Sequence, residues 1–474
     1  MMHYYIQLLL PFKQELLLLL TIFILLLVQL SGKKLQQEWT MQWVNIMLLV
    51  TVLAGFWQVG YSTDLSTMFQ LTPFNAFEKT VLVFATYLIS LQAYNWLLHH
   101  EQIMEFYVLL LSSLLGMFCM ISATNLLFFY VGLELSSIPL AILANFHLQK
   151  KQSSEAAFKF IVSASFASAL LLFGISLLYG CTGSLSFINI ADHLVINFFS
   201  ILAFVLFFVG LAFKISVVPF HLWTADVYEG SPVTITAFLS VVSKASVLFV
   251  LLNFLFKVFN SLENVWHVMV LILLTLTIVV GNLFALRQQN FKRFMAFSSI
   301  TQVGFILIAL LGQNITGSAA VVYFIVVYLF SNLCVFGVIA LVAAITGKEK
   351  IEDFKGFYQT NPFLAWVLLL GLFSLAGIPP TAGFFGKFFL LLSGAQSNYF
   401  GWITFAALNL VVSLYYYLRV VVVIFHRESA AVIAPIQIPK PVQFSFFICI
   451  AGVIITGVGS WIYTYIYSLA AAAF

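Results

Sequence analysis

The sequence predicts an all-α integral membrane protein with about fourteen transmembrane helices. Of its 474 residues, 63% are hydrophobic and only 8% are charged, with a mean hydropathy of +1.09. A soluble chain of this length would need far more charge on its surface. The apolar segments run without interruption for roughly 20 residues, the length of a membrane-spanning helix, whereas the strands of a membrane barrel would alternate apolar and polar residues.

Fourteen spans are predicted, and no connection between them is long enough to divide the chain into separate domains. Their ranges are 8–30, 41–60, 74–95, 104–122, 124–147, 155–180, 195–229, 232–257, 264–286, 291–311, 317–346, 361–394, 399–425 and 442–468. We therefore expect one membrane domain over residues 1–474. Within it we expect three N-terminal helices (1–103), a first repeat (104–257), a second repeat (264–425) and a last helix (442–468).

The connections between spans differ in charge in an alternating way. The odd-numbered connections carry the basic residues Lys33, Lys34, Lys150, Lys151, Arg287, Lys292, Arg293, Lys348, Lys350, Lys355, Arg427 and Lys440. The even-numbered connections carry almost no charge beyond Asp64 and Lys257. Lysine and arginine are enriched in cytoplasmic loops, so this asymmetry predicts cytoplasmic odd connections and two termini on the opposite side.

Two of the spans, 195–229 and 361–394, are too long for one straight helix. The first contains Pro219, and the second contains Gly377 followed by Pro379 and Pro380. Proline removes a backbone donor, and in a bilayer such a gap is tolerated only in protein or beside a water-filled cavity. Broken helices at corresponding positions of two halves are typical of transporters built from inverted repeats, here with breaks in the seventh and twelfth helices.

Four ionisable side chains lie inside spans, where each costs about 2.5–3.5 kcal/mol on insertion scales. They are Glu134, Lys214, Lys244 and Lys387. We interpret them as a proton relay, because a buried lysine near a movable carboxylate can load and release a proton. The alternative is that the lysines extend to the membrane surface or form a static ion pair. The relay predicts that Glu134 and Lys214 lie within ion-pairing reach.

His221 follows the first break and is a further relay candidate, because histidine titrates near neutral pH. Asp226 and Glu229, a few residues later, are interpreted as solvated structural residues at the cytoplasmic end. Boundary positions are predicted for the other charged residues near span ends, namely Glu78, Lys79, Glu105, Glu155 and Lys159.

Several classes of function lack their sequence signals. The net charge of +4 is small and scattered, which does not indicate a nucleic-acid partner. The four cysteines form no Cys-x-x-Cys pair. Glycine-rich dinucleotide loops, phosphate-binding loops and metal-ligand clusters are missing, so no cofactor or metal site is expected in this chain.

The stretch 213–234, FKISVVPFHLWTADVYEGSPVT, resembles the signature of the antiporter-like membrane subunits of proton-pumping NADH:quinone oxidoreductase, respiratory complex I. The sequence around Glu229 and the position of Lys244 resemble those of subunit N most closely. Chain length, helix number, both breaks and Thr182-Gly183-Ser184 extend the resemblance over essentially the whole chain. Ala225 stands where a proline is expected, which does not affect the lysines.

The resemblance implies two inverted five-helix repeats that form linked half-channels. It implies that Glu134 modulates the pKa of Lys214, that Lys244 passes protons along the centre, and that Lys387 exchanges them with the far side. A glutamate replaces Lys387 in the sister subunit M, and the lateral helix of subunit L is missing here.

NADH, FMN, iron–sulfur clusters and quinone are expected in partner subunits, so the partners are other membrane and peripheral subunits of the complex and the lipid bilayer. The expected location is the bacterial inner membrane. A cation/proton antiporter complex or a membrane-bound hydrogenase shares this fold and remains an alternative. A purely structural membrane anchor would leave the buried lysines unexplained.

Overall fold

A computed structural model of the protein describes residues 10–32, 36–58, 63–64, 68–312, 314–396, 399–426 and 433–474. Lys33, Lys34 and Arg427, three of the basic loop residues, lie outside the described residues. The described part is helical apart from a small antiparallel sheet of β1 (Thr63–Asp64) and β2 (Gln70–Leu71).

Thirteen helices of the described chain are long and apolar enough to cross a membrane. They are α2 (Lys13–Leu30), α3 (Gln37–Gln58), α4 (Pro73–Gln92), α6 (Ile103–Ser122), α7 (Leu126–Ala144), α8 (Lys151–Thr182), α10 (Phe198–Ile215), the continuous helix Val233–Val258, α14 (Glu263–Ala285), α15 (Phe291–Ala309), α16 (Asn314–Thr346), α20 (Phe400–Ile424) and α21 (Lys440–Val458). The shorter helices α18 (Pro362–Ala376) and α19 (Ala382–Ala395) together make a further crossing. The predicted architecture of about fourteen spans is therefore confirmed.

The continuous helix Val233–Val258 changes its winding twice. It consists of α12 (Val233–Phe238), the π-helical turn η2 (Leu239–Ser243), α13 (Lys244–Asn253) and a second π-helical turn, η3 (Phe254–Val258). The remaining short elements are η1 (Leu10–Phe12), α5 (Tyr94–Leu97), α9 (Phe187–His193), α11 (Leu222–Gly230), η4 (Asn260–Leu262), η5 (Ile351–Phe354), α17 (Phe357–Thr360) and α22 (Ser460–Ala473). The predicted last span, 442–468, is instead two helices, α21 and α22, that meet at Gly459.

Both predicted helix breaks are present. Helix α10 ends where Ser216 adopts a left-handed conformation with φ 64°, and α11 resumes at Leu222. Helix α18 ends at Gly377 with φ 87°, a value that suits glycine, and α19 begins at Ala382. Pro219, Pro379 and Pro380 are themselves exposed, whereas Ser216, Val217 and Val218 of the first break are buried. A neighbouring helix can supply a hydrogen bond to a backbone group that the break frees. The backbone N–H of Val218, for example, donates to Thr277 Oγ1 of α14 at 3.1 Å.

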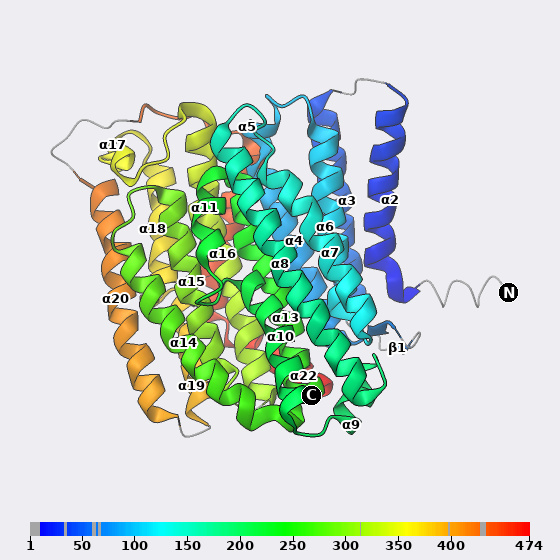
Figure 1. Ribbon diagram of the computed structural model, residues 1–474. Helices are drawn as coiled ribbons and strands as arrows, with labels where there is room; N and C mark the ends of the chain where they lie inside the picture. Colours follow the sequence, from blue (N-terminus) through cyan, green and yellow to red (C-terminus); the bar gives the residue numbers. More distant parts are fainter. Residues whose placement is uncertain are drawn as a thin grey trace.

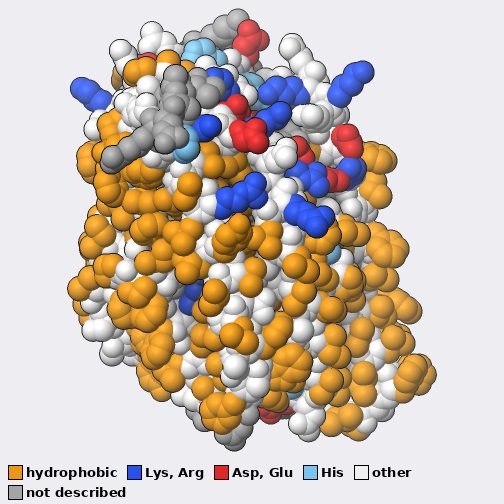
Figure 2. Space-filling model, turned by 90° about the vertical axis from the view of Figure 1, so that its left-hand side faces the viewer, with side chains coloured by type: hydrophobic (Ala, Val, Ile, Leu, Met, Phe, Trp, Pro, Cys, Tyr) orange, Lys and Arg blue, Asp and Glu red, His pale blue; other side chains and the backbone are white. Residues whose placement is uncertain are grey.

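The two ends of the helical bundle differ in charge. Figure 1 shows α5 and α17 at one end and α9 with the C-terminus at the other. Charged side chains gather at the α5 end, while the flank between the two ends is mostly hydrophobic (Figure 2). One pocket at this end is lined by Lys150, Lys292 and Glu349 together with Trp96. The backbone of Lys350 forms an isolated β-bridge with the backbone of Asn290. The described basic connections therefore share one end, as the alternating charge pattern predicts.

Close helix packing fixes the position of α7. Helices α6 and α7 approach so closely that a Cβ atom on Gly132 would lie 2.9 Å from the carbonyl oxygen of Gly116. Real side chains do not fit at that distance, so both positions need glycine. Helices α21 and α22 pack against α16 and α4, so the C-terminal helices contact an early helix of the chain.

Candidate functional site

Lys244 is a buried cation on α13, directly after the π-helical turn η2, and only 3% of it is exposed. Its ammonium group donates a hydrogen bond of 2.8 Å to Ser299 Oγ on α15 and lies 5.6 Å from the centre of the Tyr228 ring. A cavity of about 10 Å³ adjoins Lys244 and Ser299, which is room for about one water molecule. Lys244 therefore has a polar partner and space for a proton-carrying water.

Lys387 lies on α19, after the second break, and is also 3% exposed. Its ammonium group donates to the carbonyl oxygens of Leu375 at 2.6 Å and Ala376 at 3.1 Å. These residues end α18, and the carbonyls at a helix C-terminus are unpaired and carry partial negative charge. The second half of the broken helix thus supplies a cation to the end of the first half.

Gln302 connects the surroundings of the two lysines. It lies on α15 three residues after Ser299, on the same helix face. Its side-chain amide donates at 3.1 Å to the carbonyl oxygen of Leu375, the same atom that accepts from Lys387. Neither Ser299 nor Gln302 was predicted from the sequence, because neither side chain is ionisable. A glutamine within an apolar span was the available signal, because polar groups in a bilayer also need partners.

Lys214 lies one residue before the end of α10 and is 7% exposed. Its ammonium group donates to the hydroxyl of Ser137 on α7, and it lies 5.8 Å from the centre of the Phe160 ring. Glu134, half-buried on the same helix as Ser137, interacts electrostatically with Lys214. No ion pair joins them within the described chain, contrary to the predicted ion-pairing reach. Lys214 donates instead to Ser137, three residues after Glu134 on α7.

His221 lies in the break between α10 and α11 and is half-buried. Its Nδ1 atom has no hydrogen-bond partner among the described residues, and the ring interacts electrostatically with Lys244. The fold holds α11 against the end of α10 through Trp223, whose Nε1 donates to the Phe213 carbonyl at 3.0 Å. No hydrogen bond or ion pair from His221 to either Lys244 or Lys214 is found in the described chain.

Asp226 and Glu229 belong to an ion-pair network outside this buried group. Arg293 contacts both carboxylates, at 2.9 and 2.8 Å, and Lys159 contacts Asp226 at 2.7 Å. Each member of the network is about one-third or more exposed. The network links α8, α11 and α15, in agreement with the structural interpretation of the two acids.

Glu78 and Lys79 lie within the first two turns of α4, near the predicted span end, but they are covered by protein there. Both are 0% exposed. Lys79 forms a 2.5 Å ion pair with Glu15 of α2, while neither carboxylate oxygen of Glu78 has a hydrogen-bond partner among the described residues. Both residues are near a predicted span end, but neighbouring helices cover α4 there, and a single sequence does not reveal that cover.

Comparisons with known proteins bear on the whole chain. Residues 123–413 match the family model described as NADH:quinone oxidoreductase/Mrp antiporter, TM. The chain belongs to this family. A protein of Phocaeicola vulgatus named NADH-quinone oxidoreductase subunit N is 44% identical over 90% of this chain and 91% of its own length. A protein with the same name from Azobacteroides pseudotrichonymphae is 47% identical over 82% of each chain.

Solved structures agree with this assignment. A chain of respiratory complex I from Thermus thermophilus with bound aureothin has a TM-score of 0.79 and 27% identity, covering 94% of this chain and 98% of that one. The Mrp complex from Dietzia has a TM-score of 0.85 at 18% identity, covering 98% and 97%, which shows a shared fold only. The predicted resemblance to subunit N is confirmed, and the relatives favour it over the antiporter alternative.

The described residues contain no group of three or more His, Cys, Asp or Glu side chains arranged to hold a metal ion. The site holds amines, carboxylates, hydroxyls and amides, which are groups that can bind and transfer protons.

Proposed function

We propose that this chain is a proton-translocating subunit N of an NADH:quinone oxidoreductase, and that protons move through its buried relay. The relay residues are Glu134, Lys214, His221, Lys244 and Lys387. The names of the relatives support the complex, and the buried lysines support the role within it. NADH, flavin, iron–sulfur and quinone chemistry is proposed for partner subunits, which this chain contacts within the membrane.

The observation that carries the proposal is the polar connection between Lys244 and Lys387. Lys244 contacts Ser299, and Gln302 on the same face of α15 shares the Leu375 carbonyl with Lys387. Apolar packing would be the default in a membrane interior, and each buried polar group costs free energy unless it is paired. Ser299 and Gln302 therefore place polar groups between the two lysines, and the Gln302 side-chain oxygen has no hydrogen-bond partner among the described residues. Proton transfer requires such polar groups between the lysines.

The broken helices position two of the relay lysines. Lys214 lies in the last turn of α10, and Lys387 reaches back to the end of α18. The carbonyls at the end of α18 accept from the Lys387 ammonium, whereas the Lys214 ammonium donates to Ser137 of α7. A change in the distance between Glu134 and Lys214 would alter how readily Lys214 holds its proton, because a nearby carboxylate stabilises the ammonium form. Electron transfer elsewhere in the complex would drive such a change.

We also propose that residues 104–257 and 264–425 are the two repeats of one membrane domain, since each contains one broken helix. The odd-numbered connections are placed in the cytoplasm and both termini on the other side of the bacterial inner membrane. The gathering of lysine and arginine at the α5 end supports this orientation (Figure 2).

The test compares alanine and arginine at each lysine in the complete complex. Lys244→Ala should lower proton pumping by about tenfold or more, as expected when an acid–base group is lost. Lys244→Arg should impair pumping as well, because guanidinium does not release its proton at accessible pH. The same holds for Lys214 and Lys387. Pumping is measured in sealed liposomes as acidification per NADH oxidised.

Lys355→Ala, in an exposed loop, is the control and should leave pumping unchanged. A static ion pair predicts the reverse pattern, in which arginine preserves activity and alanine reduces the amount of assembled complex. Full pumping by all three arginine variants would contradict the proposed proton relay.

A further inference from the structure

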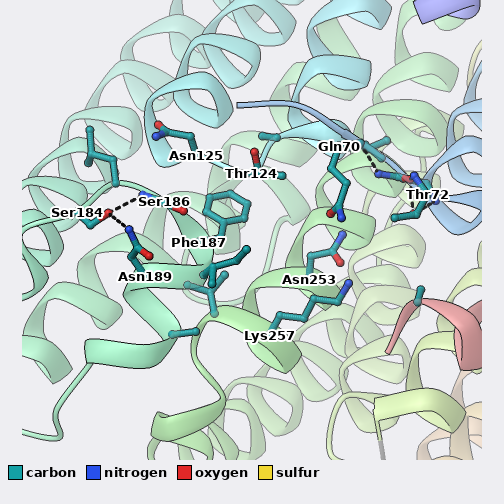
Figure 3. A pocket seen from close by; sticks show the side chains of 18 of the residues that line it. Gln70, Thr72, Thr124, Asn125, Ser184, Ser186, Phe187, Asn189, Asn253 and Lys257 are labelled. Carbon is teal, nitrogen blue, oxygen red and sulfur yellow. Dashed lines mark hydrogen bonds between the residues drawn. The ribbon is translucent and has the colours of Figure 1, made fainter. Parts of the chain in front are cut away.

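A second polar region lies at the opposite end of the bundle from the basic connections. A cavity of about 740 Å³ is formed between the β2–α4 turn, the loop before α9, and the turn η3. Figure 3 shows Gln70, Asn253 and Lys257 on one side of this pocket and Ser184, Ser186 and Asn189 on the other. Hydroxyl and amide groups on both walls make it a suitable space for water.

Lys257 is the cation of this pocket. It lies on η3, the second π-helical turn of the helix that also carries Lys244. Its ammonium group lies 4.6 Å from the centre of the Phe474 ring, and it has no ion pair within the described chain. π-Helical turns inside α-helices occur frequently at functional sites, and here each of the two turns adjoins or contains a lysine.

The carboxyl group of Glu78 is the matching acid. Glu78 lies on α4 one turn after Phe74 and Asn75, which line the pocket, and so shares their helix face. It is fully buried, and neither carboxylate oxygen has a hydrogen-bond partner among the described residues. Lys79 does not neutralise it directly, because the Lys79 ammonium is bonded to Glu15.

Glu78 and Lys257 interact electrostatically without direct contact. An unpaired carboxylate in a membrane interior is costly. A water molecule that bridges it to the pocket would satisfy both groups, and bridging waters are nearly as favourable as direct hydrogen bonds. Among the described residues, the titratable groups around the pair include Lys79, Glu15, the terminal carboxylate of Phe474 and the exposed Asp192, which lines the pocket.

We propose that Glu78 and Lys257 form a second proton-exchange site, which water reaches through this pocket from the C-terminal end of the bundle. A proton moves from the Lys257 ammonium through a pocket water to a Glu78 oxygen. One N–H bond breaks, one O–H bond forms, and both groups end neutral. The reverse transfer recharges the pair.

This site is separate from the relay. Lys244 and Lys257 are thirteen residues apart on one helix, which at 1.5 Å per residue separates them by roughly 20 Å along its axis. The exchange chemistry needs only the pocket and the pair. Its contribution to pumping rests on the proposed function.

Difference infrared spectroscopy of the complete complex in sealed liposomes tests the exchange directly. We expect a carboxyl band that changes when the pH is varied on the pocket side and not on the other side. The band should be lost in Glu78→Gln and kept in Asp192→Asn, the exposed acid of the same pocket. A wild-type spectrum that matches Glu78→Gln at every pH would overturn the proposal.

Pumping per NADH oxidised separates exchange from a static pair. Glu78→Gln and Lys257→Met should each lower it, and the double variant should stay low, because the exchanging groups are gone. A static pair predicts recovery in the double variant, where both charges are removed together. That recovery would contradict proton exchange.

Lys244→Ala, measured in parallel, keeps the two proposals distinguishable. Full pumping by Lys244→Ala would refute the relay while the infrared band still decides the Glu78 site. Lost pumping by Lys244→Ala with no Glu78 band would refute the second site alone.

Discussion

At the scale of single residues, Gln302 is the position where the relay is most open to test. Its amide donates to the Leu375 carbonyl that also accepts from Lys387. We expect Gln302→Leu to reduce pumping about tenfold, because it removes a polar link and leaves a neighbouring acceptor with one donor fewer. Proton uptake by the reconstituted complex measures this effect.

Gln92→Leu is the matched control for that change. Gln92 is also a buried membrane glutamine that donates to a backbone carbonyl, Leu333 O at 3.1 Å, but it lies outside the relay. If Gln302 only stabilised the fold, both variants would lose assembled complex to a similar degree. Equal losses of pumping in the two variants would contradict a special role for Gln302.

His147 lies in a connection at the basic end, outside the spans. Its burial predicts that the stability of the folded chain depends on pH. Burial, followed by the charges of Lys150, His100 and Lys292, lowers the pKa of His147 from its ordinary value of 6.5 to about 4. The folded chain therefore keeps this histidine neutral at pH values where the unfolded chain protonates it. Stability should fall as the pH drops from about 6.5 to about 4.

His147→Gln should weaken that acid sensitivity, because glutamine does not take up a proton. Thermal unfolding of the purified complex at several pH values between 4 and 7 measures it. The exposed His193→Gln variant serves as the control. Identical pH profiles for the wild type and His147→Gln would show that other groups determine the acid response.

The residues that sequence reasoning found and missed differ in one physical respect. Lys214, Lys244 and Lys387 are recognisable because a charge inside an apolar span is rare and expensive. Ser299 is missed because a serine can satisfy itself on its own helix, and only the fold reveals that it also accepts from Lys244. The burial of Glu78 was missed because its distance from a span end suggests solvent, while burial depends on neighbouring helices.

At the scale of elements, the first break depends on a hydrogen bond from another helix. Thr277 on α14 accepts from the Val218 N–H at 3.1 Å and donates to the Leu273 carbonyl at 2.6 Å. Thr277→Val keeps the shape but leaves that N–H unpaired, at a cost of about 1–3 kcal/mol. We expect a lower thermal unfolding midpoint for this variant and partial recovery in Thr277→Ser.

Thr275→Val, two residues earlier on the same helix, tests whether the loss is specific to the break. Thr275 donates only to the Leu271 carbonyl of its own helix, so its replacement should change stability much less. A comparable loss at both positions would mean that the Val218 contact does not support the break.

The two breaks could be predicted, whereas the two π-helical turns could not. Proline removes a backbone donor whatever surrounds it, so Pro219 and Pro380 in overlong spans favour an interruption. Proline alone does not decide it, because α7 continues through Pro139. Leu239–Ser243 and Phe254–Val258 contain no proline or glycine. Their wider winding comes from packing and hydrogen bonding with other helices, which local sequence does not specify.

At the scale of the whole molecule, composition predicted the membrane fold because lipid leaves few alternatives to helices. It did not predict how the helices lie beside one another. Helices α21 and α22 return to pack on α16 and α4, a contact between the end of the chain and its third span. Such long-range contacts depend on shape complementarity across the bundle, and the periodicity of a single segment does not predict them.

Orientation in the membrane is the property of the whole molecule that the charge pattern predicts most directly. Lys355 lies in an exposed connection at the α5 end, and Asp192 lies on α9 at the other end (Figure 1). We expect Lys355→Cys to react with a membrane-impermeant thiol reagent only from the cytoplasmic side and Asp192→Cys only from the opposite side. The reason is that lysine and arginine are retained in cytoplasmic loops during insertion. The exposed native Cys181 is replaced by serine in both variants, since it would otherwise react itself. Labelling of both cysteines from the same side would mean that a span was miscounted, and labelling with the sides exchanged would reverse the direction in which the relay moves protons.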